Sequence, residues 1–233
     1  MDARRPQQGG PPLVLLAGIS LGLLVVGLAI GAAIGGIPPL PYRSAAAVTD
    51  YFRAQSAAAQ TAAVFVFGSS VPLVIYAATA SARLRQLGVT APGATIAFAG
   101  GVLAAGALGL SSLLLWTLSR PDVGATADVV RALYYLVYLT GGVGHVVMLG
   151  LLVAGMAVPS LILGLLPKPL AQAGLVIAAV SELTTIVLIW PETSPLLPIA
   201  RFAALLWLVV AGALLPHRRL NRHARDQASV AGT

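Results

Sequence analysis

Glu182 is the residue whose chemistry most needs an explanation. It lies near the middle of a stretch that reads QAGLVIAAVSELTTIVLIWP (172–191), and it is the one acidic residue inside any apolar run of the sequence. At about 1.5 Å of rise per residue, this stretch is long enough as a helix to cross a hydrocarbon core of about 30 Å. A carboxylate at that depth costs about 3 kcal/mol on insertion scales. We therefore expect Glu182 to have a cationic partner, a bound proton or a water-filled cavity.

Arg201 is the predicted partner of Glu182. It lies five residues after Leu196, in the first turns of the last apolar run. The helical rise places Arg201 about 8 Å and Glu182 about 12 Å below the same interface. The two runs are consecutive and antiparallel, so that an ion pair between them would neutralise both charges. We rank this structural pair slightly ahead of a functional site.

Two further polar residues, His145 and Tyr138, lie in the fourth apolar run. Tyr134, Tyr138 and His145 are spaced i, i+4 and i+11, which predicts one helix face. A lone histidine in a membrane is more often a hydrogen-bonded packing residue than a ligand. The sharper hypothesis is an intramembrane polar site, a cavity lined by Tyr138, His145, Glu182 and Arg201.

Metal, cofactor and enzyme chemistry are not expected. The chain has no cysteine, which rules out disulfides, thiolate metal sites and cysteine nucleophiles. One histidine lies within an apolar run, so paired axial histidines for haem are missing. No phosphate loop, zinc motif or serine nucleophile elbow is present. The glycines of Gly141–Gly144 lie in the middle of a run, where they indicate close packing or a helix irregularity rather than a nucleotide loop.

The composition predicts an all-α, polytopic transmembrane helix bundle with six spans. Of the 233 residues, 58% are hydrophobic and 9% are charged, with a mean hydropathy of +0.91, whereas soluble domains carry about 25% charged residues. So few charges could not cover the apolar surface of a soluble chain. The predicted segments are a cytoplasmic leader over 1–12, spans over 13–34, 57–80, 94–118, 132–156, 170–190 and 196–215, and a basic cytoplasmic tail over 217–233.

Three local patterns refine this prediction. Ser44–Gln55 could form a helix that leads into the second span. The uncharged run from the fourth span to Pro167 is too long for one straight span, so we expect Pro159 to redirect the chain. Gly27, Gly31 and Gly35 recur every fourth residue, which favours packing inside the bundle over a homodimer face.

The positions of the basic residues predict that both termini lie in the cytoplasm. With the N-terminus inside, nine of the fourteen lysines and arginines fall in inner segments and five in outer segments. This bias explains the net charge of +7 better than a nucleic-acid partner would, and no nucleic acid is expected. The tail 217–225 would contact anionic lipid. Because alanine, glycine and arginine are abundant, we expect a bacterial protein of the inner (plasma) membrane.

The C-terminal half resembles a known group. The segments RALYYLVYLTGGVGHVVMLGLLVAGMAVPSL, LLPKPLAQAGLVIAAVSELTTI and PIARFAALLWLVVAGALLP are similar to those of uncharacterised bacterial six-span membrane proteins of a domain-of-unknown-function family. That family has a Pro-basic/aromatic-Leu-x-x-x-Gly-Leu entry to the fifth span, which here reads Pro-Leu-Ala-Gln-Ala-Gly-Leu over Pro169–Leu175, and a sixth span containing Trp-Leu. Members often carry an acidic residue early in the last span, where this chain has Arg201. The resemblance implies a fold and no activity.

Three function classes stay open. The first is a non-enzymatic membrane module that acts with a membrane-protein partner or as a homo-oligomer in the lipid bilayer. The alternative is a small transporter or sensor that uses a polar site around Glu182. An intramembrane enzyme is the weakest, because no nucleophile–base pair or metal set can be assembled. A cavity reaching Glu182 would favour the transporter or sensor, and a closed core with a Glu182–Arg201 pair would favour the module.

Overall fold

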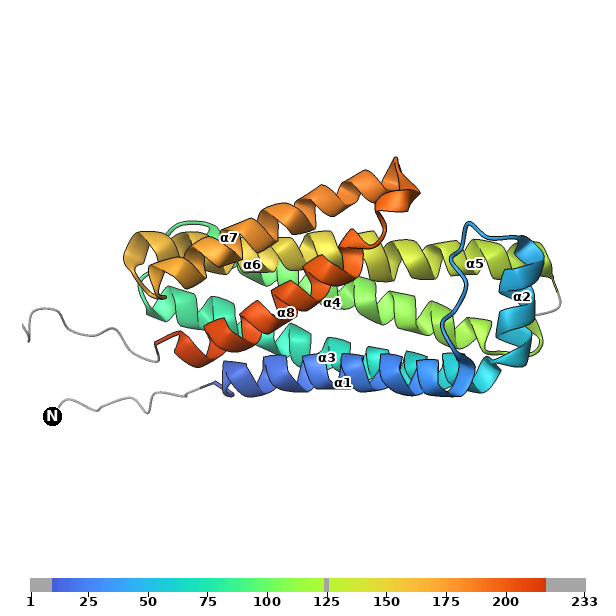
Figure 1. The fold of residues 1–233 in the computed structure, drawn as a ribbon. Helices are drawn as coiled ribbons and strands as arrows, with labels where there is room; N and C mark the ends of the chain where they lie inside the picture. Colours follow the sequence, from blue (N-terminus) through green and yellow to red (C-terminus); the bar gives the residue numbers. More distant parts are fainter. Residues whose placement is uncertain (1–9, 124–125, 217–233) are drawn as a thin grey trace, which may run out of the picture.

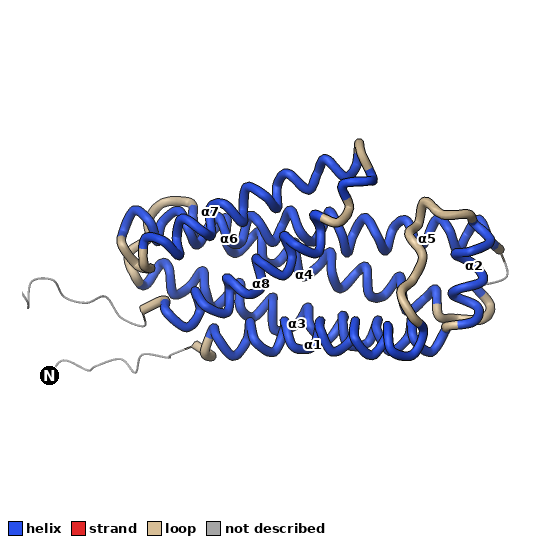
Figure 2. The backbone as a smooth tube through the Cα atoms, in the orientation of Figure 1, coloured by secondary structure: helices blue, strands red, loops and turns tan. Residues whose placement is uncertain are grey.

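Six long apolar helices form the fold, as predicted. The structure is a computed structural model that describes residues 10–123 and 126–216, and no strand occurs in these ranges (Figure 2). Most of the predicted leader and the whole predicted tail lie outside the described residues. The six segments that are long and apolar enough to cross a membrane are Leu13–Gly35, Ser56–Gln86, Gly93–Leu118, Ala127–Leu163, Lys168–Leu188 and Pro191–Leu214.

Figure 1 labels the helices that make up these segments. The first three segments are α1 (Leu13–Gly35), α3 (Ser56–Gln86) and α4 (Gly93–Leu118). The fourth consists of α5 (Ala127–Leu139), a π-helical turn (Thr140–Gly144) and α6 (His145–Leu163). The fifth is α7 (Lys168–Leu183), which tightens into a 3-10 turn (Thr184–Leu188), and the sixth is a short 3-10 turn (Pro191–Thr193) followed by α8 (Leu196–Leu214).

Neighbouring helices in the sequence pack side by side. α3 packs between α1 and α4, α4 packs between α3 and α6, and α7 packs on α6. α8 returns across the bundle to contact both α1 and α7 (Figure 1). Buried hydroxyls join helices across this core: Tyr76 of α3 donates to the Leu208 carbonyl of α8 at 2.9 Å, and Ser20 of α1 donates to the Ser69 carbonyl of α3 at 2.8 Å. Such bonds satisfy polar groups that lipid cannot.

Small residues bring the helices close together. A methyl group on Gly27 would lie 2.5 Å from the Cβ of Phe65, and one on Gly35 would lie 2.6 Å from the Cβ of Ala58. Gly27, Gly31 and Gly35 thus pack inside the bundle, against α3, and their fourfold spacing predicted the packing inside the bundle. Between α4 and α6 the approach is closer still, because a Cβ at Gly155 would lie 2.4 Å from the backbone nitrogen of Ala97.

The fourth segment differs from the prediction at Pro159. We expected this proline to redirect the chain, but α6 continues through Pro159 to Leu163 and ends at Gly164, whose φ is 65°. The whole segment is 37 residues long. A proline is tolerated in a span when the surrounding protein accommodates the freed backbone groups. The irregularity lies instead at Thr140–Gly144, where three glycines allow the wider π-helical turn.

The helix α2 (Ala45–Ala54) closes one end of the bundle. Its N-terminus is capped by Ser44, whose hydroxyl accepts from the Ala47 amide at 3.3 Å, and Gln55 separates it from α3. The predicted helix over Ser44–Gln55 is therefore confirmed. In Figure 1, α2 stands across the ends of the long helices. Its buried Phe52 packs edge-on against Tyr134 of α5, with ring centroids 4.9 Å apart.

The outer surface of the bundle is apolar. On α3 alone, the exposed large side chains are Val64, Phe67, Val71, Val74 and Ile75. In water such a surface would promote aggregation, whereas lipid solvates it. Six apolar helices with an apolar outer surface are consistent with a multi-pass membrane protein.

Candidate functional site

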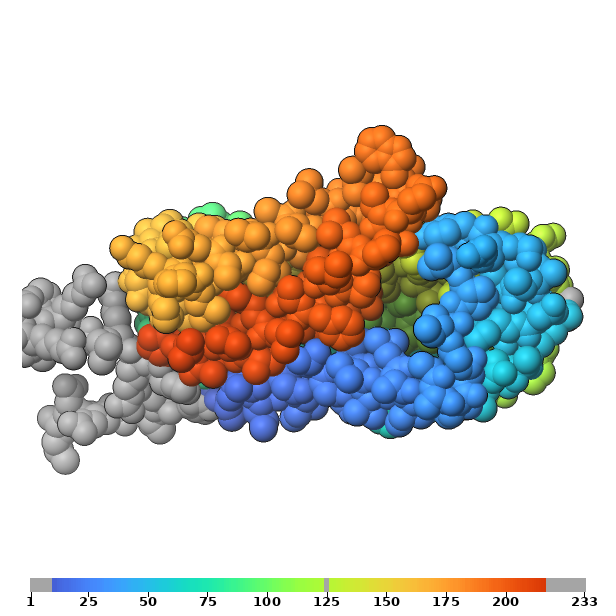
Figure 3. All heavy atoms as spheres, in the orientation of Figure 1, coloured from blue at the N-terminus to red at the C-terminus, as the bar shows by residue number. Residues whose placement is uncertain are grey.

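A cavity of about 620 Å³ lies at the α2 end of the bundle. Residues of α1, α3, α4, α5 and α8 line it, together with the segment that leads into α2. In Figure 3 it is visible as a recess bounded by α8, α1 and the segment before α2. The recess forms because α1 and α8 meet near Leu13 and Gly212, at the opposite end of the bundle, and diverge from there (Figure 1). This cavity therefore opens sideways, between two of the long apolar helices.

Arg201 is the charged residue that lines the cavity. It lies in the second turn of α8, and its guanidinium donates a hydrogen bond to the backbone carbonyl of Gly141 in the π-helical turn. Its Nε is buried and has no hydrogen-bond partner. Among the described residues, no carboxylate forms an ion pair with Arg201. The guanidinium is thus a cation held in place by a neutral group.

Tyr138 of α5 lines the same cavity, and its buried hydroxyl also lacks a hydrogen-bond partner. Its ring packs edge-on against Tyr42, with centroids 5.6 Å apart. Tyr42 lies outside the spans, in the segment before α2, and burial raises its pKa above the ordinary value of 10.0. The phenol of Tyr42 therefore stays protonated at any physiological pH.

The π-helical turn places Arg201 and Tyr138 on the same cavity. Ser111 of α4 packs directly on this turn, because a Cβ on Gly141 would lie 2.3 Å from the Ser111 oxygen. The Ser111 hydroxyl donates to the Val137 carbonyl at 2.8 Å. These contacts fix the turn against α4 and leave the Gly141 carbonyl directed at α8. Glycine is needed here for close approach.

His145 lies outside the cavity, contrary to the predicted common face. Its side chain is fully buried between α6 and α4, where Nδ1 lies 2.9 Å from the Ala104 carbonyl. Because a carbonyl only accepts, Nδ1 carries the proton, and the buried Nε2 has no partner. Tyr134 and Tyr138 line the cavity together, but the π-helical turn between Tyr138 and His145 changes the rotation of the helix. His145 is thus placed as a packing residue with one hydrogen bond.

Glu182 also lies outside the cavity, and it does not pair with Arg201. It is exposed on the surface of α7. Its carboxylate rests against α6, since a Cβ on Gly150 would lie 3.4 Å from Glu182 Oε1. The expected ion pair does not form. The helical rise predicted how deep each residue lies along its helix, but it did not predict the rotation of α7 about its axis. Of the four predicted site residues, the structure brings Arg201 and Tyr138 together.

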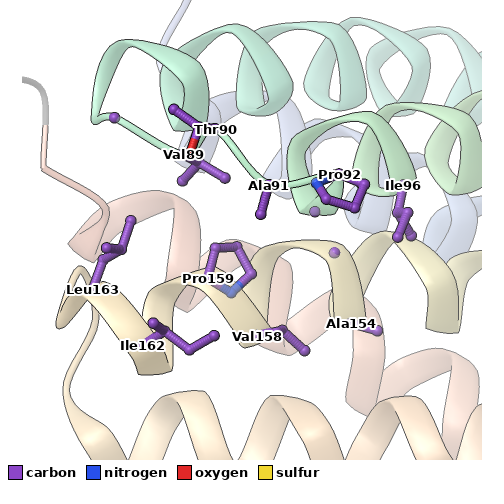
Figure 4. Close-up of a pocket in the computed structure, with 13 residues that line it drawn as sticks. Val89, Thr90, Ala91, Pro92, Ile96, Ala154, Val158, Pro159, Ile162 and Leu163 are labelled. Carbon is purple, nitrogen blue, oxygen red and sulfur yellow. The ribbon is translucent and has the colours of Figure 1, made fainter.

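A second pocket, of about 410 Å³, lies at the other end of the bundle. It is formed by the connection between α3 and α4 and by the last turns of α6, with Val89, Pro92, Val158 and Pro159 around it (Figure 4). No charged residue lines it. Thr90 supplies a hydroxyl to this pocket (Figure 4), which among the described residues has no charged group to orient an ionic ligand.

The comparisons add no relative. No family model, no curated protein and no solved structure matches the chain. The resemblance to a six-span family of unknown function therefore stays a prediction. Within residues 10–123 and 126–216, no group of three or more His, Cys, Asp or Glu side chains could hold a metal ion.

Sequence reasoning missed most of the cavity wall. The wall is made of apolar residues of α1 and α3 and of the segment before α2, such as Leu28, Ile37 and Ala62. Their types do not distinguish them from ordinary packing residues. The GIPPLP segment (36–41) was the available signal, because it breaks α1 and turns the chain across the bundle end.

Proposed function

We propose that this protein is a non-enzymatic membrane module that binds a hydrophobic small molecule in the cavity beside Arg201, as a sensor or carrier for it. The observation that carries the proposal is a guanidinium without a counter-ion among the described residues, at the wall of a cavity whose other lining residues are uncharged and mostly apolar. Small-molecule sites are commonly apolar cavities of about 300–1,000 Å³ with a few polar groups that orient the ligand. The cavity meets both criteria.

The sideways opening supports a ligand that arrives through the bilayer. A hydrophobic molecule dissolved in lipid reaches the recess between α1 and α8 without crossing water (Figure 3). Binding rather than catalysis is favoured by the chemistry of Arg201. A guanidinium donates hydrogen bonds and carries a permanent charge, whereas general acid–base catalysis needs a group that can both release and accept a proton.

Native mass spectrometry of the intact protein, extracted from its own membrane in a neutral maltoside detergent, tests this function. We expect a bound molecule on the wild type. Val137→Phe places an aromatic ring in the cavity and should abolish binding of this molecule. Val158→Phe makes the same change at the apolar pocket of Figure 4 and should leave it in place. A wild type without a bound molecule, or equal occupancy in Val137→Phe, would contradict the proposal.

A second candidate function is assembly with another membrane protein, and the exposure of Glu182 favours it. The exposed face of α7 is otherwise apolar along Val176, Ala179 and Leu183. A partner helix with a cationic group or hydrogen-bond donor at the depth of Glu182 would satisfy this carboxylate. The same mass spectra test this. We expect a larger complex that Glu182→Gln dissociates and that Glu192→Gln, at the end of the bundle, leaves intact. A monomer mass for all three proteins would rule it out.

A further inference from the structure

The cavity has two chemically different ends, and the difference indicates what binds there. At one end lie Arg201 and Tyr138, both with buried polar atoms that lack a hydrogen-bond partner. Ser194 and Pro195 also line this end, where α8 begins. The N-terminus of a helix carries a partial positive charge, so that the dipole of α8 adds to the charge of Arg201. The charge of Arg201 and the dipole of α8 both favour an anion at this end.

Arg201 is costly in its present environment. A cation within a bilayer-spanning helix loses hydration, and a single hydrogen bond to a neutral carbonyl replaces only part of it. The carbonyl of Gly141 is the one hydrogen-bond acceptor of the guanidinium among the described residues. An anionic group in contact with the guanidinium would make a charge-assisted hydrogen bond, which is about twice as strong as a neutral one.

At the other end the wall is hydrocarbon. The lining residues include Leu24 and Leu28 of α1, Val66 of α3 and Leu115 of α4. No charged side chain lines this part. An alkyl chain placed here exchanges lipid contacts for protein contacts and leaves no polar group unsatisfied. The apolar end therefore suits the tail of an amphiphile.

Size and access restrict the amphiphile further. At about 620 Å³, the cavity is of the size that encloses one drug-sized molecule. One alkyl chain with a compact head group is of this size, whereas a lipid with two chains would leave one chain outside. The gap between α1 and α8 opens onto the lipid-facing surface, so that such a molecule enters tail and head together (Figure 3).

We propose that the ligand is a single-chain amphiphile with an anionic head, of the long-chain carboxylate class. Its carboxylate binds Arg201 and the Tyr138 hydroxyl, and its alkyl chain lies between α1, α3 and α4. This inference rests on the proposed function, since it assigns a ligand class to the same cavity.

Binding of radiolabelled oleate to the full-length protein in maltoside detergent tests the inference. We expect saturable binding of oleate and at least about tenfold weaker binding of oleyl alcohol, which has the same chain and a neutral head. A charge-assisted hydrogen bond contributes about 1.5–3 kcal/mol, which corresponds to a factor of about ten or more. Arg201→Gln should reduce oleate binding to the level of the alcohol, and Arg201→Lys should restore part of the affinity.

Two other anions are tested separately, as competitors of bound oleate. Inorganic phosphate at millimolar concentration should not displace oleate, because it has no apolar part, and dioleoyl phosphatidate should displace it poorly, because its second chain does not fit. If the melting temperature of Arg201→Gln shows that this variant does not fold, Tyr138→Phe replaces it in the oleate binding assay. We expect a several-fold loss of affinity for oleate and none for the alcohol.

The outcomes separate the ligand class from the function. If oleate and oleyl alcohol bind equally and Val137→Phe abolishes both, the cavity binds a ligand but the anionic class is wrong. Displacement by phosphate, or unchanged oleate binding in Arg201→Gln, likewise overturns the class. If Val137→Phe binds oleate as the wild type does, the cavity is not the site, and the proposed function fails together with this inference.

Discussion

Arg201 of α8 donates a hydrogen bond to the carbonyl of Gly141, in the π-helical turn of the fourth segment. The contact joins the last span to the middle of the longest one, 60 residues earlier in the chain. It also sets where the one charge of the cavity wall lies, between α5 and the start of α8. The properties of the cavity follow from this contact.

The close packing of α4 on α6 should be intolerant of a single methyl group. A Cβ at Gly100 would lie 2.6 Å from the Leu152 amide nitrogen, which belongs to the backbone of α6 and cannot turn aside. We expect Gly100→Ala to lower the free energy of unfolding by about 1–3 kcal/mol, the usual effect of overpacking. Unfolding in mixed micelles with increasing dodecyl sulfate, followed by circular dichroism, measures it.

Gly106 of the same helix provides the matched control. A Cβ there meets nothing within 4 Å. Gly106→Ala should leave stability unchanged or raise it by up to about 1 kcal/mol, because alanine has the higher helix propensity. Equal effects of the two substitutions would show that α4 and α6 are not packed as described.

The hydroxyl of Tyr76 should make a measurable contribution to the packing of α8. It is fully buried and donates to Leu208 at 2.9 Å. Tyr76→Phe removes this bond and the longer contact of the hydroxyl with Met156 Sδ at 3.7 Å, and it keeps the ring. We expect a loss of about 0.6 kcal/mol and at most about 1.7 kcal/mol, as for other hydrogen bonds between membrane helices. Thermal unfolding in detergent measures the loss. Tyr51→Phe, which removes an exposed contact of 3.4 Å to Gly36, should have no effect.

Replacement of Glu182 by glutamine should stabilise the isolated protein. The carboxylate is exposed on a lipid-facing helix and forms no ion pair among the described residues. A neutral amide at that depth is less costly to solvate, so we expect a gain of up to about 3 kcal/mol. The measurement is the same dodecyl sulfate titration, with Glu192→Gln as the control for an acidic residue at the bundle end. A loss of stability would mean that the carboxylate itself holds α7 on α6.

The orientation of the bundle is still a prediction, and the absence of cysteine makes it simple to test. Single cysteines at Asp122 or Ser194 should react with an impermeant maleimide on intact cells, because the excess of arginine in the other loops places these two outside. Cysteines at Thr90 or Lys168 should react only after lysis. The reverse pattern would show that both termini face outward.

The sequence was sufficient for the fold because the fold depends on length and composition. Runs of about 20 apolar residues between charged loops predict membrane helices whatever their internal order. The spacing of Gly27, Gly31 and Gly35 predicted packing inside the bundle for a similar reason, because a fourfold repeat lines one face of a straight helix, and the structure shows that this face contacts α3. The prediction at Pro159 was wrong because a proline breaks a helix only where the neighbouring residues do not compensate for the lost hydrogen bond.

The candidate site was harder to predict, because it depends on rotation. Counting residues predicts how far along its helix each of Glu182 and Arg201 lies. Whether their side chains meet also depends on the rotation of each helix about its own axis. Contacts with all the other helices set this angle. In the packed bundle, Glu182 lies on the exposed face of α7, and Arg201 is directed toward Gly141. Tyr138 lines the same cavity as Arg201, and His145 does not, because the π-helical turn lies between Tyr138 and His145.

The π-helical turn of Thr140–Gly144 is equivalent to one inserted residue in an otherwise α-helical rod. Each residue of an α-helix advances by about 100° around the axis. Loss of that one residue would therefore shift the phase of α5 against α6, and carry the Tyr134 hydroxyl away from the Pro39 carbonyl that it now reaches at 2.8 Å. A single-codon deletion at this point would rearrange a whole wall of the cavity, where the same deletion in a surface loop would change almost nothing.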